Sequence, residues 1–245
     1  MTIVGDAQAE PGSGSTSGRA EPWAGSLKRV DLGEIPYEDA IEEMRGWVEQ
    51  RRAGQAGDRL FLLSHPPVIT YGHRTDPADL RLGQHDIPVL PVDRGGYATY
   101  HGPGQLVGYL VADLRERGPA DVVRWLEGGL VRALGELGFA AQRRDTPPGG
   151  SSLVGVWTAD ERKVASIGMR IRHGITSHGF ALNVDPDLRA FDQFTVCGLP
   201  GVRMTSLREL AAEQGVAVPS DPAVRDAVYR ALAAASAGPR SPGAA

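Results

Sequence analysis

The sequence has little cysteine, no long apolar run and no excess of basic charge. Its single cysteine, Cys197, cannot form a disulfide within a chain of 245 residues, which favours a reducing compartment. No uninterrupted apolar segment approaches the roughly 20 residues of a membrane span. The formal net charge of −4 argues against nucleic-acid binding, which normally needs a basic surface. We therefore expect a cytoplasmic protein without a membrane or nucleic-acid partner.

The composition predicts one compact unit between two tails. A hydrophobic fraction of 41% is ordinary for globular proteins and allows a sizeable core. Residues 1–25 and 236–245 are rich in Gly, Ser, Pro and Ala, and their apolar content is too low to offset the entropy of ordering. We predict that both segments are disordered tails and that residues 26–235 form a single domain, active as a monomer.

Periodicity predicts an α/β fold. Helical spacing and turn chemistry indicate four helices, over 37–53, over 119–137, from 205–206 and from 221. Short or alternating apolar runs indicate strands at 59–64, 68–71, 87–92, 106–114, 153–158, 163–172 and after the turn at 173–174. Because the last three strands follow one another through short turns, we expect a mixed, largely antiparallel sheet with flanking helices.

The segment 94–105 carries the strongest functional signal. It reads Arg-Gly-Gly-Tyr-Ala-Thr-Tyr-His-Gly-Pro-Gly-Gln and lies between two apolar runs. Glycine has no Cβ, so backbone amides here can approach a ligand closely, and Gly102-Pro103-Gly104 suits a tight turn. Packing alone hardly explains a segment this small and polar. We predict a loop that cradles a substrate.

Small residues also repeat on two neighbouring predicted strands. Ser166 and Gly168 alternate with larger apolar residues, and Gly179 and Ala181 do the same in the next strand. Small residues on one face leave room for a flat or extended group. These two strands therefore predict the floor of a binding site.

Together these motifs resemble the octanoyltransferases of lipoate biosynthesis, in order, from about residue 30 to about residue 210. The matching segments are 65–67 (His-Pro-Pro), 71–72 (Tyr-Gly), 94–105, Lys163, 166–168 (Ser-Ile-Gly), 178–184 (His-Gly-Phe-Ala-Leu-Asn-Val) and 197–198 (Cys-Gly). The resemblance implies the fold of the biotin and lipoate protein ligase catalytic domains, with residues 26–235 as a catalytic acyltransferase domain. It also implies transfer of an octanoyl or lipoyl group from acyl carrier protein to a lysine of a lipoyl domain. Expected acceptors are the lipoyl domains of 2-oxo acid dehydrogenase complexes and the glycine cleavage H-protein.

The resemblance also assigns roles to single residues. Cys197 is expected to be the nucleophile that carries the acyl group as a thioester, with the Lys163 ammonium stabilising its thiolate. The matched positions expected to contact substrate are Arg94, Gly95, Gly96, Tyr97, Ala98, Thr99, Tyr100, His101, Ser166, Ile167, Gly168, Gly179, Phe180 and Ala181. No metal or cofactor is expected, because thioester exchange needs no nucleotide and the sequence contains no P-loop or Rossmann motif.

The residues alone leave other interpretations open. A lone cysteine is more often a small buried hydrophobe, and Lys163, directly after the charged residues 160–162, would by default be a solvated turn lysine. His101 and His178 lack the spacing of a metal site. Four arginines could meet an acidic carrier or simply be solvated: Arg143, Arg144, Arg170 and Arg172.

Three other functions compete with the transferase. The first is an ATP-dependent lipoate or biotin ligase, which activates its acid as an adenylate and needs no cysteine nucleophile. The second is a non-catalytic module that binds acylated carrier or lipoyl domains. The third is a thioesterase, which would release free octanoate without an acceptor.

Overall fold

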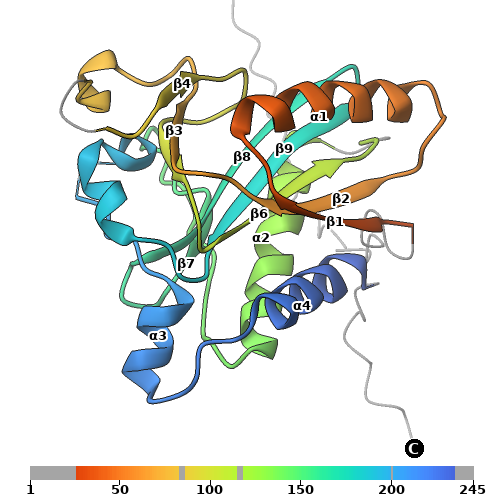
Figure 1. Ribbon diagram of the computed structural model, residues 1–245. Coiled ribbons are helices and arrows are strands. Elements are labelled where there is room, and N and C mark those ends of the chain that lie inside the picture. The colour runs from red at the N-terminus through yellow and green to blue at the C-terminus, as the bar shows by residue number, and fades with distance from the viewer. Residues whose placement is uncertain (1–25, 83–85, 115–117, 200, 235–245) are drawn as a thin grey trace, which may run out of the picture.

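The computed structural model describes residues 26–82, 86–114, 118–199 and 201–234, so both predicted tails, 1–25 and 236–245, lie outside the described residues. Its centre is a six-stranded sheet in the order β1 (Lys28–Glu34), β2 (Arg59–Ser64), β6 (Gln105–Val111), β9 (Ile175–Asn183), β8 (Lys163–Arg172) and β7 (Gly155–Trp157) (Figure 1). β1 and β2 run parallel, and the other neighbours are antiparallel. The predicted mixed, largely antiparallel sheet is confirmed.

A second, three-stranded sheet has the order β4 (Val89–Pro91), β3 (Val68–Tyr71) and β5 (Thr99–His101). β5 lies inside the segment 94–105, so the prediction of an uninterrupted loop there is wrong. The backbone of β5 pairs antiparallel with β3, a partner remote in sequence. Threonine and tyrosine favour a strand, but glycine does not, so the flanking glycines lower the strand propensity of the segment as a whole. β1, a mostly polar strand at the edge of the larger sheet, was also not predicted.

The helices agree with the predicted positions: α1 (Tyr37–Arg52), α2 (Pro119–Glu136), α3 (Leu207–Gln214) and α4 (Asp221–Ala233). Short 3₁₀ turns add η1 (Pro77–Leu80), η2 (Leu188–Gln193) and η3 (Val196–Gly198). The hydroxyl of Ser206 caps α3 by accepting from the Glu209 amide. α2 ends just before Gly138, whose φ of 89° lies outside the helical region.

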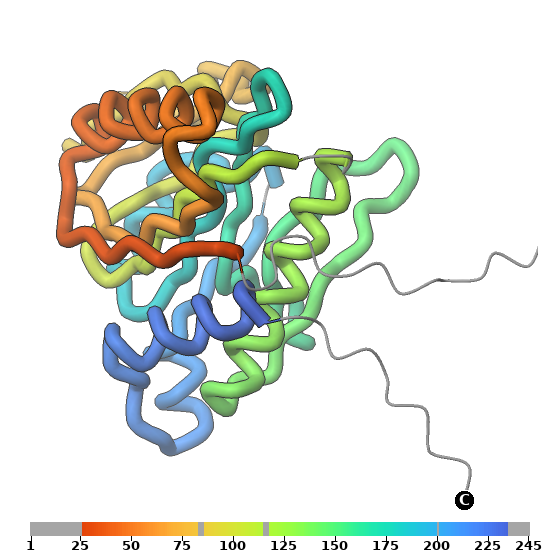
Figure 2. Tube along the Cα trace, turned by 90° about the vertical axis from the view of Figure 1, so that its right-hand side faces the viewer, coloured from red at the N-terminus to blue at the C-terminus, as the bar shows by residue number. Residues whose placement is uncertain are grey.

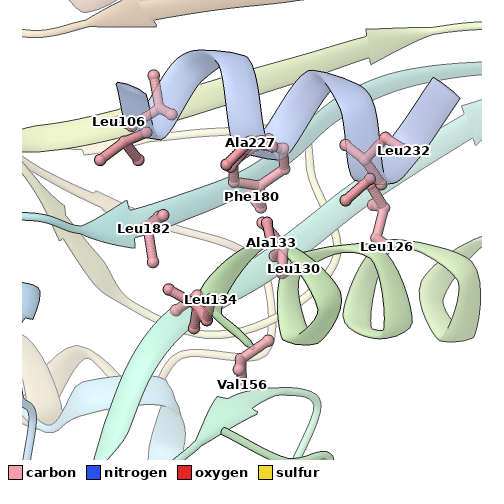
Figure 3. Close-up of a cluster of buried hydrophobic side chains, with 14 of the residues drawn as sticks. Leu106, Leu126, Leu130, Ala133, Leu134, Val156, Phe180, Leu182, Ala227 and Leu232 are labelled. Atoms are coloured by element: carbon pink, nitrogen blue, oxygen red, sulfur yellow. The ribbon is translucent and has the colours of Figure 1, made fainter. Parts of the chain in front are cut away.

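The helices cover both faces of the six-stranded sheet. α2 and α4 pack on one face, where Leu126, Leu130 and Leu232 meet Phe180 and Leu182 of β9 (Figure 3). α1 covers the opposite face, and Figure 2 shows α1 and α4 on either side of the strands. The small sheet and η2 enclose a third apolar cluster. None of the helices described here is long and apolar enough to span a bilayer.

Candidate active site

Lys163 and Cys197 meet in space. Lys163 Nζ lies 3.3 Å from Cys197 Sγ, although 34 positions separate the two residues. Lys163 is 2% exposed, and its ammonium lies 5.1 Å from the centre of the Trp157 ring. The default interpretation of a solvated turn lysine is therefore wrong. The reason is that the turn ends at Arg162, and Lys163 already belongs to β8, with its amide bonded to the Arg203 carbonyl.

The η3 turn presents the Cys197 thiol. Cys197 has a left-handed backbone, with φ 55° and ψ 20°, and its amide donates to the Ala98 carbonyl oxygen at 2.9 Å. Gly198 follows with φ 63°, and any Cβ there would collide with the Tyr97 ring. Ser166 Oγ lies 3.9 Å from the sulfur. The thiol is thus held between β8 and the glycine-rich segment.

A cavity of about 380 Å³ lies beside this pair. Most of the predicted substrate residues line it, namely Arg94, Gly95, Gly96, Tyr97, Thr99, His101, Ser166, Ile167, Gly168, Gly179, Phe180 and Ala181, together with Lys163 and Cys197. The sheet register pairs Ser166 with Ala181 and Gly168 with Gly179. The small residues predicted to form a floor are therefore direct neighbours on adjacent strands.

Two of the predicted substrate residues, Ala98 and Tyr100, do not line this cavity. Side chains alternate along β5, so Thr99 and His101 face the cavity while Ala98 and Tyr100 point to the opposite side. There Tyr100 packs edge-on against Phe191, with ring centroids 5.5 Å apart. Ala98 approaches the site only through its carbonyl oxygen, which binds the Cys197 amide.

Arg94 places a buried cation over the floor. Its Nη2 donates to the carbonyl and hydroxyl oxygens of Thr70 at 3.1 and 3.0 Å, and Nη1 donates to the Gly95 carbonyl. Burial lowers the pKa of Arg94, while the nearby Tyr37 and Cys197 act in the opposite direction. A guanidinium in this position favours negative charge in the cavity.

The wall on the α1 side consists of tyrosines and histidines, of which Tyr37 and Tyr109 were not predicted from the sequence to belong to the site. His65 Nε2 and the Tyr109 hydroxyl lie 2.8 Å apart, and Tyr37 stacks on His101 with centroids 5.7 Å apart. Burial lowers the pKa of His101 well below its ordinary value and that of His178 to about 3. Burial raises the pKa of Tyr37 and Tyr109. These side chains are therefore uncharged at neutral pH.

Three of the four arginines considered for carrier binding already have acidic partners. Arg143 binds Glu127 at 2.9 Å, Arg144 binds Glu161 at 2.8 Å and Arg170 binds Asp93 at 2.6 Å. Arg172 lies exposed at the end of β8. Within the described ranges, no group of three or more His, Cys, Asp or Glu side chains is arranged to hold a metal ion.

A thiol in contact with a buried lysine, beside a cavity with a glycine floor, is typical of an enzyme active site. The family model described as the lipoyl protein ligase A/B catalytic domain matches residues 36–233. An octanoyltransferase of Frankia casuarinae is 47% identical over 80% of this chain and 90% of its own length. One of Thiobacillus denitrificans is 41% identical over 87% of this chain and 94% of its own. The chain belongs to this family and, within it, to the octanoyltransferases, which are acyltransferase enzymes.

Solved structures show the same fold at low identity. A bipartite lipoate protein ligase of Thermoplasma acidophilum superposes with a TM-score of 0.63 and 17% identity, covering 84% of this chain and 82% of its own. Lipoate-protein ligase A bound with ATP superposes with a TM-score of 0.62 and 17% identity, covering 85% of this chain and 84% of its own. The expected ligase fold is confirmed. The names of the relatives in sequence favour the transferase over the ligase.

Proposed function

We propose that this protein transfers an octanoyl or lipoyl group from acyl carrier protein to a lysine of a lipoyl domain, through a thioester on Cys197. The 3.3 Å contact between Lys163 Nζ and Cys197 Sγ carries the proposal. The cavity beside it is within the size range of small-molecule sites. The octanoyltransferase name of the relatives supports the choice of acyl group.

In the first step the Cys197 thiolate attacks the carbonyl carbon of the donor thioester. The new carbon–sulfur bond forms as the bond to the carrier sulfur breaks, and the carrier thiolate takes a proton from the Lys163 ammonium. One thioester replaces another, so no nucleotide is consumed. The Lys163 ammonium 3.3 Å away stabilises the attacking thiolate before the proton moves.

In the second step the neutral ε-amine of the acceptor lysine attacks the acyl-Cys197 thioester. An amide bond forms, Cys197 leaves as a thiolate, and the proton lost by the amine passes to the neutral Lys163 amine. This restores the original ion pair. The step runs downhill because an amide is more stable than a thioester.

Both tetrahedral intermediates carry an oxyanion that needs hydrogen-bond donors. The amides of Gly95 and Cys197 already donate to Met169 and Ala98, so neither is available. The Ser166 hydroxyl, 3.9 Å from the sulfur, and the Arg94 guanidinium remain within the same cavity. Removing one such donor typically costs about 2.7–4 kcal/mol in the barrier.

The proposed donor is octanoyl-acyl carrier protein. The proposed acceptors are the lipoyl domains of 2-oxo acid dehydrogenase complexes and the glycine cleavage H-protein. In this proposal residues 26–235 act as one catalytic domain of a cytoplasmic monomer.

Intact-mass spectrometry after mixing with octanoyl-acyl carrier protein, without ATP, tests the proposal. The unaltered protein should gain one octanoyl mass that hydroxylamine removes, and Cys197→Ser should gain none that hydroxylamine removes. No adduct without ATP, but transfer when ATP and free octanoate are supplied, would indicate a ligase. Release of free octanoate at the same rate with and without a lipoyl domain would indicate a thioesterase.

A further inference from the structure

A second cavity, of about 990 Å³, adjoins the first. It lies between α1 and the turn end of the β8–β9 hairpin, and its lining combines apolar residues, such as Ile41, Val48 and Ile175, with charged residues of α1 and β8. Two of the described residues, Tyr37 and His178, line both cavities. Because they line both, these two residues stand as a partition between the two spaces.

The His178 ring reaches this partition through an unusual backbone conformation. Alternation along β9 would place it with Phe180 and Leu182, which pack against α2 and α4. Instead His178 has φ 59°, and its ring meets the Tyr109 ring on the α1 side, with centroids 6.0 Å apart. Its amide donates to Met44 Sδ at 3.2 Å. Strain of this kind persists only where the surrounding structure enforces it, and it clusters at functional sites.

Strand register fixes the distance from the nucleophile to the partition. Cys197 Sγ lies 3.9 Å from Ser166 Oγ, at the level of the Ser166–Ala181 pair. His178 pairs with Met169, three residues further along β8. At about 3.3 Å per residue, the partition stands about 10 Å beyond the level of the sulfur. An extended eight-carbon acyl chain spans about 9 Å, given bonds of about 1.5 Å and trans torsions.

Resting on the proposed octanoyl transfer, we propose that His178 determines acyl-chain length in this enzyme. Its ring closes the acyl cavity against the second cavity and stops chains longer than octanoyl. Between Cys197 and this wall lies the Gly168–Gly179 pair, whose members carry no side chains of their own, with Arg94 above Gly168. Behind the wall, the second cavity has room for further methylene groups.

The chemistry of His178 suits a wall. Burial, with the guanidinium groups of Arg94 and Arg170 nearby, lowers its pKa to about 3, so the ring is uncharged at neutral pH. An uncharged ring faces the methyl end of a chain without the cost of burying a charge. Neither ring nitrogen has a hydrogen-bond partner among the described residues. A ring of similar size without nitrogens should therefore fill the same role.

The test compares acylation by octanoyl- and dodecanoyl-acyl carrier protein, followed by intact mass. Glycine adopts a positive φ without strain, so His178→Gly should fold and should raise the dodecanoyl-to-octanoyl rate ratio roughly tenfold or more. His178→Asn, which also tolerates positive φ, should raise the ratio too and is a second way to open the wall. His178→Phe should keep the ratio of the unaltered protein.

Ser177→Gly is the matched control. Ser177 lines the second cavity but not the first, so its replacement should leave the dodecanoyl-to-octanoyl rate ratio unchanged. An unchanged ratio in folded His178→Gly and His178→Asn proteins, with octanoyl adducts still formed, would overturn the chain-length role alone. Loss of the octanoyl preference in His178→Phe would overturn it as well, since that result assigns the role to the ring nitrogens. Absence of any adduct on the unaltered protein would overturn the proposed function together with this inference.

Discussion

The backbone amide of Cys197 donates to the carbonyl oxygen of Ala98 at 2.9 Å. This bond docks the η3 turn on the glycine-rich segment, although the two are far apart in sequence. It also helps to hold Cys197 in a left-handed conformation that non-glycine residues seldom adopt. The position of the thiol between Lys163 and Ser166 is therefore set by backbone contacts, before any substrate binds.

Replacing Lys163 with methionine should slow chemistry while leaving the fold intact. Methionine fills a similar buried volume but removes the ammonium 3.3 Å from the sulfur. We expect acylation of Cys197 at pH 7 to slow by roughly 10²–10⁴-fold, because both thiolate stabilisation and the proton donor are lost. Rapid-quench intact mass measures this rate. Lys28→Met, at an exposed site on β1, is the control, and a Lys163→Met rate close to the control rate would remove Lys163 from the mechanism.

Two floor glycines should respond differently to alanine. A Cβ at Gly168 would lie 3.1 Å from the Gly95 carbonyl oxygen and 3.2 Å from Arg94 Nη1, while one at Gly179 would collide with the Gly108 carbonyl of β6. Gly168→Ala should fold and acylate roughly tenfold more slowly, whereas Gly179→Ala should lose about 1–3 kcal/mol of stability. Calorimetry and acylation rates distinguish them. A Gly179→Ala protein as stable as Gly168→Ala would contradict the register of β6 and β9.

Elements whose signals are local in sequence were predictable. The bounds of β8 match the predicted 163–172, because strict alternation ends at the His173-Gly174 turn. α1 and α2 likewise follow from apolar spacing. β5 was missed because its strand character depends on β3, which lies far away in sequence, and because glycines surround it.

The candidate site, too, could be predicted from the sequence only in part. Motifs identified Lys163 and Cys197, but only the fold shows their contact. Tyr109 lies in a strand buried along its whole length, where nothing distinguishes a cavity residue from a core residue. The orientation of His178 depends on a positive φ, which a sequence does not reveal for a non-glycine residue. Arg143 looked free in the sequence because its partner Glu127 is placed beside it only by folding.

The buried histidines should make the protein sensitive to acid. The pKa of His178 is about 3 in the folded protein against 6.5 ordinarily, so between these values the unfolded chain binds a proton that the folded chain does not. The free energy of unfolding should therefore fall as pH drops from 6.5 towards 3, by about 1.4 kcal/mol per pH unit for this residue. Urea unfolding of the unaltered protein and of His178→Phe across this range measures the difference. If the unfolding free energies of the two proteins depended on pH in the same way, His178 would not be buried as described.

Glu127 should stabilise the strand that borders Lys163. Its buried carboxylate, from α2, accepts hydrogen bonds from the Gly155 amide at 3.0 Å and from Arg143 Nε at 2.9 Å. Glu127→Leu leaves the Gly155 amide without its acceptor and should cost about 1–3 kcal/mol, while Glu127→Gln keeps an acceptor oxygen and should cost less. The control is Glu136→Leu, at an exposed position of the same helix, which should stay within about 0.5 kcal/mol of the unaltered protein. Equal losses of unfolding free energy at the two positions would show that the β7 contact contributes nothing. A stable Glu127→Leu protein that acylates slowly would instead show that this contact acts mainly by positioning Lys163.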